Sequence, residues 1–354
     1  MRGAIERITR GSFDNLREDS RFNSVPIVDL RSEGEFADGH IPRAVNVALF
    51  NNEQRALVGT CYKQEGKKPA VQLGLELLAG QIDSFNEGLW QHTQDRRIVL
   101  HCWRGGMRSW SVAIFLASQG LDVFIIDGGY KAYRAWVRAR LNDFSKHKLL
   151  IVTGRTGSGK SEFIASLPKD FPVIDLEALA RHRGSAFGHF KQKEDSPTQQ
   201  QFENQLVDEY IRIAHHPAVV LEIEHAIGPV KVPTVLRHAM MKSEMILIER
   251  SLEDRIKLLK QIYTDKWTPD DDQDFLTSLQ QLARYIPKTK LQELQQLLRL
   301  RSFDELIKEL LVLRYDPIYD RGLEKHKARI IRSFIVPAQH DELRAFVHQY
   351  AFSP

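Results

Sequence analysis

The sequence predicts an α/β protein of two units, each built on a parallel sheet, with a mostly helical C-terminal part. Three observations support this fold class. Apolar strand-like segments alternate with helical segments along most of the chain. A glycine-rich phosphate-binding pattern at residues 154–161 lies between a predicted strand and a predicted helix. The length of 354 residues suits about two domains. We therefore expect domains at 1–140 and 141–354, with the mostly helical region starting at about 252.

Composition limits the classes of protein to consider. The chain is 42% hydrophobic and 27% charged, as expected for a protein with real apolar cores. Its net charge of +4 permits a polyanionic partner without requiring one. Two cysteines, Cys61 and Cys102, argue against a disulfide scaffold and favour a reducing compartment. Because we find neither a signal-peptide pattern nor a membrane-spanning run, we expect a cytoplasmic protein without a membrane partner.

The first unit alternates strand and helix signals. Its predicted strands are 25–30, 44–47, 97–100 and 123–126. A capping box, Ser32 to Glu35, predicts the start of a short helix. Further helices are predicted at 73–78 and 110–118, and residues 132–144 are a basic helix or linker. The stretch 51–69 is polar, with Gly59, Gly66 and several lysines.

The second unit begins with a short apolar strand at 148–153. Its further predicted strands are 172–175, 218–222, 244–248 and 330–336. A helix is predicted directly after the phosphate-binding pattern, at 161–167. The predicted helices of the C-terminal part are 252–263, 275–285, 290–300 and 303–314.

The pattern at residues 154–161 fits G-x-x-x-x-G-K-[ST] at every required position. Gly154, Gly157 and Gly159 let backbone N–H groups turn toward a phosphate, and the following helix adds its positive end. Lys160 should reach the terminal phosphates, and Ser161 is placed to contact a magnesium ion. The pattern predicts a bound di- or triphosphate but does not identify it.

Residues with weaker signals could support this site. Asp175 and Glu222 each end a predicted strand and are candidates to hold magnesium through water, with Glu224 as a further candidate. We favour Asp175 for its proximity in the usual strand order, although either acid could instead cap a helix. Arg181 and Arg183 are candidates for contact with phosphate or a nucleic-acid backbone, or belong to a solvated helix end. We predict no structural metal site.

Cys102 directly follows a predicted buried strand and precedes two glycines and the start of a helix. Loop N–H groups and the helix dipole favour a thiolate, and Arg104 and Arg108 add positive charge. A lowered pKa would make Cys102 a nucleophile, whereas the alternative is a small buried side chain. Cys61 lacks such surroundings, so we interpret it as structural, with a resolving or substrate-contacting thiol as the alternative.

Several stretches of the first unit resemble a rhodanese domain. They are residues 28–31, 35–36, 39–46, the Cys102 loop and 126–133. That resemblance implies a loop cysteine that carries sulfur or selenium as a persulfide-type adduct. One feature departs from the family pattern, because five residues rather than four separate Cys102 from Arg108. The same spacing after His101 is typical of cysteine phosphatases, and it would also suit selenophosphate or thiophosphate.

Taken whole, the chain resembles the tRNA 2-selenouridine synthase family, in which a rhodanese-like domain precedes a P-loop NTPase-like domain. The stretches that carry this resemblance are 58–66, the Cys102 loop, 129–132, 154–161 and 175–188. It implies replacement of sulfur by selenium in wobble 2-thiouridine of tRNA, with selenophosphate as donor. It also implies geranylation of that sulfur from geranyl diphosphate, with Mg²⁺ as a candidate cofactor. An enzyme that supplies selenophosphate is a candidate partner.

Two other functions remain open from the sequence. The first is a cysteine phosphatase or sulfurtransferase fused to a P-loop small-molecule kinase. The second is a nucleotide-gated tRNA-binding module whose cysteine loop only binds an anion. The first requires Cys102 for catalysis, whereas the second requires Lys160 and tolerates loss of the thiol.

Overall fold

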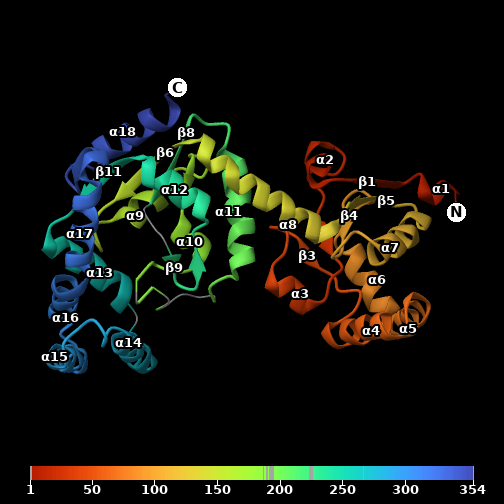
Figure 1. Cartoon of the computed structure of the whole chain (residues 1–354), viewed down its shortest axis with the longest axis horizontal. Coiled ribbons are helices and arrows are strands. Elements are labelled where there is room, and N and C mark those ends of the chain that lie inside the picture. Colours follow the sequence, from red (N-terminus) through yellow and green to blue (C-terminus); the bar gives the residue numbers. More distant parts are fainter. Residues whose placement is uncertain are drawn as a thin grey trace. The chain divides into compact units, whose positions relative to one another are not determined.

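A computed structural model describes residues 2–185, 187–188, 190, 195–222, 226–265 and 267–353. The chain divides into two compact units, Met1–Arg140 and Leu141–Pro354. Each unit contains a five-stranded parallel sheet with helices packed on it (Figure 1). The predicted α/β fold class is therefore confirmed.

The sheet of the first unit has the order β1-β5-β4-β2-β3. Its strands are β1 (Ile8–Gly11), β2 (Ile27–Asp29), β3 (Val45–Asn46), β4 (Arg97–His101) and β5 (Asp122–Ile126). Strand β4 lies in the middle, and all its side chains after Arg97 are buried. Because ligand sites in parallel sheets lie outside the carboxyl ends of the strands, this order puts Cys102 where a site is expected.

The helices of the first unit are α1 (Arg2–Ile5), α2 (Phe13–Glu18), α3 (Glu33–Asp38), α4 (Asn52–Gln64), α5 (Lys67–Ala79), α6 (Ile82–Trp90), α7 (Met107–Ser118) and α8 (Gly129–Arg140). The sequence did not indicate four of them, α1, α2, α4 and α6. The polar stretch 51–69, to which no element was assigned from the sequence, contains α4 and the start of α5. Helix α4 buries only Cys61, so it lacks the apolar periodicity that reveals a helix.

The main sheet of the second unit has the order β12-β11-β6-β8-β7. Its strands are β6 (Lys148–Thr153), β7 (Val173–Ile174), β8 (Ala218–Glu222), β11 (Glu244–Glu249) and β12 (Ile330–Ile335). A separate antiparallel pair joins β9 (Ala226–Ile227) and β10 (Val230–Lys231). Strand β6 lies between β11 and β8, so the phosphate-binding loop starts at the middle of the sheet.

The C-terminal part is mostly helical, as predicted. The helices of the second unit are α9 (Lys160–Ala165), α10 (Leu176–Ala180), α11 (Gln199–Ile213), α12 (Thr234–Lys242), α13 (Leu252–Thr264), α14 (Pro269–Gln281), α15 (Lys288–Arg299), α16 (Phe303–Leu310), α17 (Asp316–His326) and α18 (His340–Phe352). A π-helical turn, η2 (Leu311–Tyr315), joins α16 to α17. Figure 1 shows α14, α15 and α16 grouped at one end of this unit. None of the helices in the described residues could span a membrane.

Candidate functional site

Cys102 lies at the carboxyl end of β4, and its side chain is 3% exposed. The loop that follows reaches α7 after Gly106, so Cys102, Arg104 and Arg108 share one short turn. The start of α8 packs against this loop through two hydrogen bonds. The N–H of Tyr130 donates to the Cys102 carbonyl at 2.9 Å, and the N–H of Lys131 donates to the Trp103 carbonyl at 3.0 Å.

These two hydrogen bonds orient the loop amides. In a trans peptide the carbonyl and the following N–H point in opposite directions. Because the Trp103 carbonyl is held by α8, the Arg104 N–H at the other end of that peptide points toward the Cys102 sulfur, where it lowers the pKa of the thiol. The loop thereby presents backbone N–H groups to an anion.

Gly129 makes this close approach of the two segments possible. Its φ is +56°, and a Cβ atom built there would lie 2.1 Å from the Cys102 carbonyl oxygen. Gly105, at φ +60°, faces the same contact, because its Cβ would lie 2.6 Å from the Ile126 carbonyl oxygen. Any other residue at either position would both strain the backbone and push the loop away.

The environment of Cys102 favours the thiolate. Burial raises the pKa of the thiol, but the Ser109 hydroxyl, the Arg108 charge and the N–H groups of Arg104 and Ser109 outweigh it, so the pKa is lowered. Ser109 Oγ is buried and has no hydrogen-bond partner among the described residues, so no other acceptor there competes with the Cys102 sulfur for its O–H. Cys61 contrasts with this, because burial raises its pKa.

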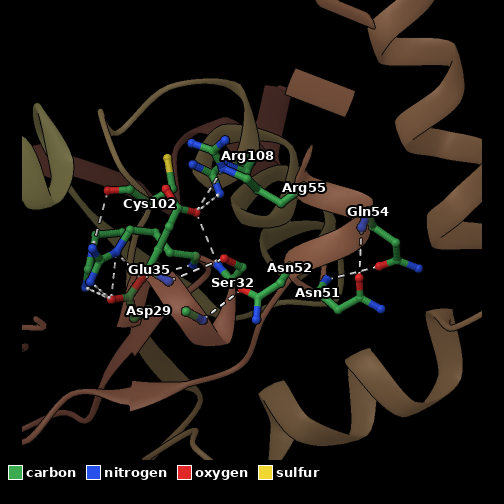
Figure 2. A network of polar contacts seen from close by, with 12 residues as sticks. Asp29, Ser32, Glu35, Asn51, Asn52, Gln54, Arg55, Cys102 and Arg108 are labelled. Atoms are coloured by element: carbon green, nitrogen blue, oxygen red, sulfur yellow. Dashed lines mark hydrogen bonds and ion pairs between the residues drawn. The ribbon is translucent and has the colours of Figure 1, made fainter. Parts of the chain in front are cut away.

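Glu35 connects the loop to a second arginine. One of its carboxylate oxygens lies 3.3 Å from Arg108 Nη1 and 3.5 Å from Arg55 Nε, and it also accepts the Ser32 N–H at 3.3 Å. Figure 2 shows Glu35 between Ser32 and the two guanidinium groups. Glu35 is therefore held by the capping box of α3, and it positions Arg108 beside the thiol.

A buried ion pair lies at the end of β2, next to Tyr130 of α8. Asp29 and Arg31 are almost fully buried, and Arg31 Nη2 donates to Asp29 Oδ2 at 2.6 Å. The Arg31 guanidinium lies 3.8 Å from the centre of the Tyr130 ring. His101 is fully buried, 3.5 Å from the Asp29 carboxylate, and burial lowers its pKa. These three side chains are thus buried and pair with one another beside the cysteine loop.

In the second unit, the phosphate-binding loop joins β6 to α9. Gly157 (φ +78°) and Gly159 (φ +95°) adopt the left-handed conformations that the pattern implies. A Cβ on Gly154 would lie 2.4 Å from the Ile248 carbonyl oxygen, so this glycine is required by the neighbouring strand. Lys160 Nζ donates to the Gly154 carbonyl at 2.8 Å, and it can exchange this acceptor for a phosphate oxygen.

Glu177 is a site residue that sequence reasoning did not identify. Ser161 Oγ donates to its carboxylate at 2.9 Å, and burial raises the pKa of Glu177 despite the Ser161 hydrogen bond and the nearby Lys160 charge. The available signal was its place in the first turn of α10, directly after a strand end. Within the described residues, no group of three or more His, Cys, Asp or Glu side chains is arranged to hold a metal.

The strand order corrects the reason for favouring Asp175. It follows β7, which is an edge strand separated from β6 by β8. Its Oδ1 accepts the Ala178 N–H at 2.8 Å, which makes Asp175 the N-cap of α10. Glu222 lies closer to the phosphate-binding loop, because it ends β8, the strand next to β6, and pairs with Val152 just before the loop. Its side chain is fully buried. Glu224 lies outside the described residues.

The basic pair after α10 is engaged with backbone. Arg181 ends the helix at φ +51° and donates to the Asp195 carbonyl at 3.4 Å. Arg183 donates to the Phe190 carbonyl at 3.3 Å, and its charge lowers the raised pKa of Glu177. Arg183 therefore acts on the phosphate-binding site, whereas nothing described brings Arg181 to it.

Side chains of α13 and α17 contact the phosphate-binding loop and hold it in place. Arg255 is 2% exposed and donates from Nε to the Thr156 carbonyl at 2.8 Å, while its Nη atoms pair with Asp316. Asp320 pairs with Arg155 at 2.8 Å. Tyr319 bonds Thr153 at 2.9 Å, and burial raises its pKa to about 12. Three residues on one face of α17 thus fix three positions of the loop region.

A small apolar cavity that is partly open to solvent lies beside this loop. Thr156 lines it on the loop side, and most of its other walls are aliphatic and aromatic side chains from α13, α14, α16 and η2. They include Leu259, Tyr263, Phe275, Leu306, Leu310 and Leu311. The second unit therefore places an apolar space against a loop built for phosphate.

Comparison with known protein families assigns both units. A rhodanese-like domain model matches residues 10–135, and the model of the tRNA 2-selenouridine synthase AAA domain matches residues 147–351. The tRNA 2-selenouridine synthase of Proteus mirabilis is 36% identical over 87% of this chain and 92% of its own length. The chain belongs to the tRNA 2-selenouridine synthase family.

Further tRNA 2-selenouridine synthases and one solved structure are also similar to this chain. The one from Marinobacter nauticus is 31% identical over 87% of this chain and 91% of its own length. The one from Nitrosomonas europaea is 39% identical over 65% of this chain and 61% of its own length. A crystal structure from Clostridium difficile 630, described as the N-terminal domain of an ATP/GTP binding protein, covers 36% of this chain and 98% of its own length at 35% identity and a TM-score of 0.34.

The two thiols should react with iodoacetamide at different pH. Because the pKa of Cys102 is lowered and that of Cys61 is raised, alkylation of Cys102 should begin at lower pH, and Ser109→Ala should shift its profile upward. Peptide mass spectrometry of alkylated protein measures both cysteines in one sample. Equal profiles for the two thiols would contradict the thiolate environment.

Gly129→Ala should damage the cysteine loop, while Gly106→Ala should be tolerated. Gly129 has a positive φ and no room for a Cβ, whereas a Cβ on Gly106 would have nothing within 4 Å. We expect Gly129→Ala to lower the free energy of unfolding by about 2 kcal/mol or more. Urea unfolding of both variants measures this difference, and similar values for the two would refute the packing described.

Proposed function

We propose that this chain replaces the sulfur of wobble 2-thiouridine in tRNA by selenium, with selenophosphate as the selenium donor. Family membership supports the overall reaction, since relatives of this name align with both units. The observation that carries the proposal is the presence of two anion-binding loops in one chain. One loop holds a thiol whose pKa is lowered, and the other adjoins an apolar cavity.

The first step is alkylation of the thiocarbonyl sulfur. A thiocarbonyl sulfur is a poor leaving group, whereas an S-alkylated sulfur departs as a thiol. Geranyl diphosphate fits the second unit, because its diphosphate suits the loop at Gly154–Ser161 and its chain suits the apolar cavity at Thr156. The sulfur attacks the carbon that bears the diphosphate, and pyrophosphate leaves. Lys160 would exchange its bond to the Gly154 carbonyl for one to the departing pyrophosphate.

A magnesium ion fits the same loop. Ser161 Oγ and the Glu177 carboxylate are 2.9 Å apart, and both are hard oxygen donors of the kind that Mg²⁺ takes. When bound, the ion would neutralise charge on the diphosphate. Glu177 would keep Ser161 oriented, and Arg183 would limit the negative charge there.

The second step is delivery of selenium at the cysteine loop. Selenophosphate is a tetrahedral anion, and the loop offers it the backbone N–H groups that α8 orients and the Arg108 guanidinium that Glu35 positions. Selenium then replaces the alkylated sulfur at the nucleoside carbon. Cys102 is the nucleophile available to act on the donor.

Mass spectrometry of wobble nucleosides tests the proposal in cells that lack the gene. Wild type should restore 2-selenouridine when selenium is supplied, and neither Cys102→Ser nor Lys160→Ala should restore it. Geranylated thiouridine should accumulate with Cys102→Ser, because alkylation does not need the thiol. Cys61→Ser is the matched control and should behave as wild type. Unchanged thiouridine in the wild-type strain would contradict the proposal.

A substitution in the cavity tests the site of the prenyl chain. Leu310→Phe should raise the KM for geranyl diphosphate by about tenfold, because the added volume competes with the chain. Inhibition by inorganic pyrophosphate, which has no chain, should stay unchanged. Leu298 belongs to the same apolar core but does not line the cavity, so Leu298→Phe serves as the control. Equal KM values for Leu310→Phe and wild type would exclude this cavity.

A further inference from the structure

Electron count restricts what Cys102 can do to a selenophosphate donor. The selenium of selenophosphate and the sulfur of a thiolate are both in the −2 state. An S–Se bond between them therefore requires loss of two electrons to an oxidant, and the proposed reaction supplies none. Attack of the thiolate on phosphorus has no such requirement, because selenide leaves with the electrons of the P–Se bond.

The loop is arranged around the phosphoryl group rather than around selenium. Five residues separate Cys102 from Arg108, the spacing shared with cysteine phosphatases. The Arg104 N–H faces the sulfur, and α7 begins at Met107 with its positive end toward the loop. A tetrahedral oxyanion that contacts these groups would have its phosphorus next to the thiolate.

Arg108 is held ready for such an oxyanion. Glu35 accepts a hydrogen bond from Arg108 at 3.3 Å and forms an ion pair with Arg55 at 3.5 Å, and its side chain is only 16% exposed (Figure 2). This carboxylate fixes one edge of the Arg108 guanidinium, which leaves its other N–H groups for phosphoryl oxygens. Glu35 is thus a positioning residue for the arginine.

Ser109 supplies a group that suits the second step of a two-step reaction. Its hydroxyl is buried and has no hydrogen-bond partner among the described residues, and it favours the Cys102 thiolate by lowering the pKa of the thiol. When a phosphocysteine is hydrolysed, the thiolate is the leaving group, and a hydrogen bond from Ser109 stabilises the charge that develops on it. Loss of this hydroxyl should therefore slow hydrolysis of the intermediate.

We propose that Cys102 attacks the phosphorus of selenophosphate and forms a phosphocysteine, which releases hydrogen selenide as the nucleophile for the tRNA. This inference rests on the proposed function. In the first step the thiolate sulfur forms an S–P bond while the P–Se bond breaks, and HSe⁻ leaves with the bonding electrons. In the second step water attacks phosphorus, the thiolate is regenerated and dihydrogen phosphate departs. HSe⁻ then displaces the alkylthiolate from the nucleoside carbon. No atom is oxidised or reduced.

The experiment is to trap the adduct on the full-length protein. Wild type, Ser109→Ala and Cys102→Ser are mixed with selenophosphate under anaerobic conditions and quenched in denaturant, and the peptide that contains residue 102 is weighed. Wild type should carry the mass of one phosphoryl group on Cys102, and Ser109→Ala should carry it on a several-fold larger fraction. Cys102→Ser should carry none. Ser118→Ala, on the same helix α7, should match wild type.

Two results would overturn the inference. One is the mass of selenium on Cys102, and the other is release of phosphate by wild type without a phosphoryl adduct on wild type or Ser109→Ala. A parallel reaction with RNA that contains S-geranyl-2-thiouridine separates this inference from the proposed function. A phosphoryl adduct without 2-selenouridine supports the intermediate and contradicts the proposed function. Formation of 2-selenouridine without an adduct does the reverse.

Discussion

The contact between Gly129 and the Cys102 carbonyl determines the character of the first unit. It lets α8 donate two backbone N–H groups to loop carbonyls, and those bonds turn the Arg104 N–H toward sulfur. The anion site is therefore made mostly of backbone, whose direction the sheet and α8 fix. Arg108 adds a side-chain charge, and its position depends on Glu35 from α3. The reactivity expected of Cys102 therefore depends on contacts from α3 and α8, which lie outside the cysteine loop.

In the second unit, too, hydrogen bonds to loop carbonyls hold the anion-binding loop in place. Here the carbonyls of the loop are held by side chains, with Lys160 on Gly154 and Arg255 on Thr156. The C-terminal helices provide Arg255 and its partner Asp316, and they also enclose the apolar cavity. The C-terminal helices therefore contribute directly to the site, because they hold the phosphate-binding loop and line the apolar cavity beside it.

Much of the framework could be predicted because it follows from local patterns. Buried strands such as β4 and β6 are short apolar runs, and glycines before Lys160 have positive φ because the phosphate-binding turn demands it. Other features depend on tertiary contacts that no local pattern carries. Helix α4 has a polar surface, and the contact of Glu177 with Ser161 depends on how α10 packs against the loop. The preference for Asp175 rested on an assumed strand order, whereas β8 lies between β7 and β6.

The central claim is that the two loops perform separate, successive steps on one nucleoside. It is tested most directly by supplying the intermediate. RNA with S-geranyl-2-thiouridine is incubated with selenophosphate and either Lys160→Ala or Cys102→Ser, and 2-selenouridine is measured by mass spectrometry. The account predicts that Lys160→Ala forms selenouridine at the wild-type rate, because its defect is bypassed, and that Cys102→Ser forms none. Failure of Lys160→Ala on this substrate, or full activity of Cys102→Ser, would contradict the division of labour between the loops.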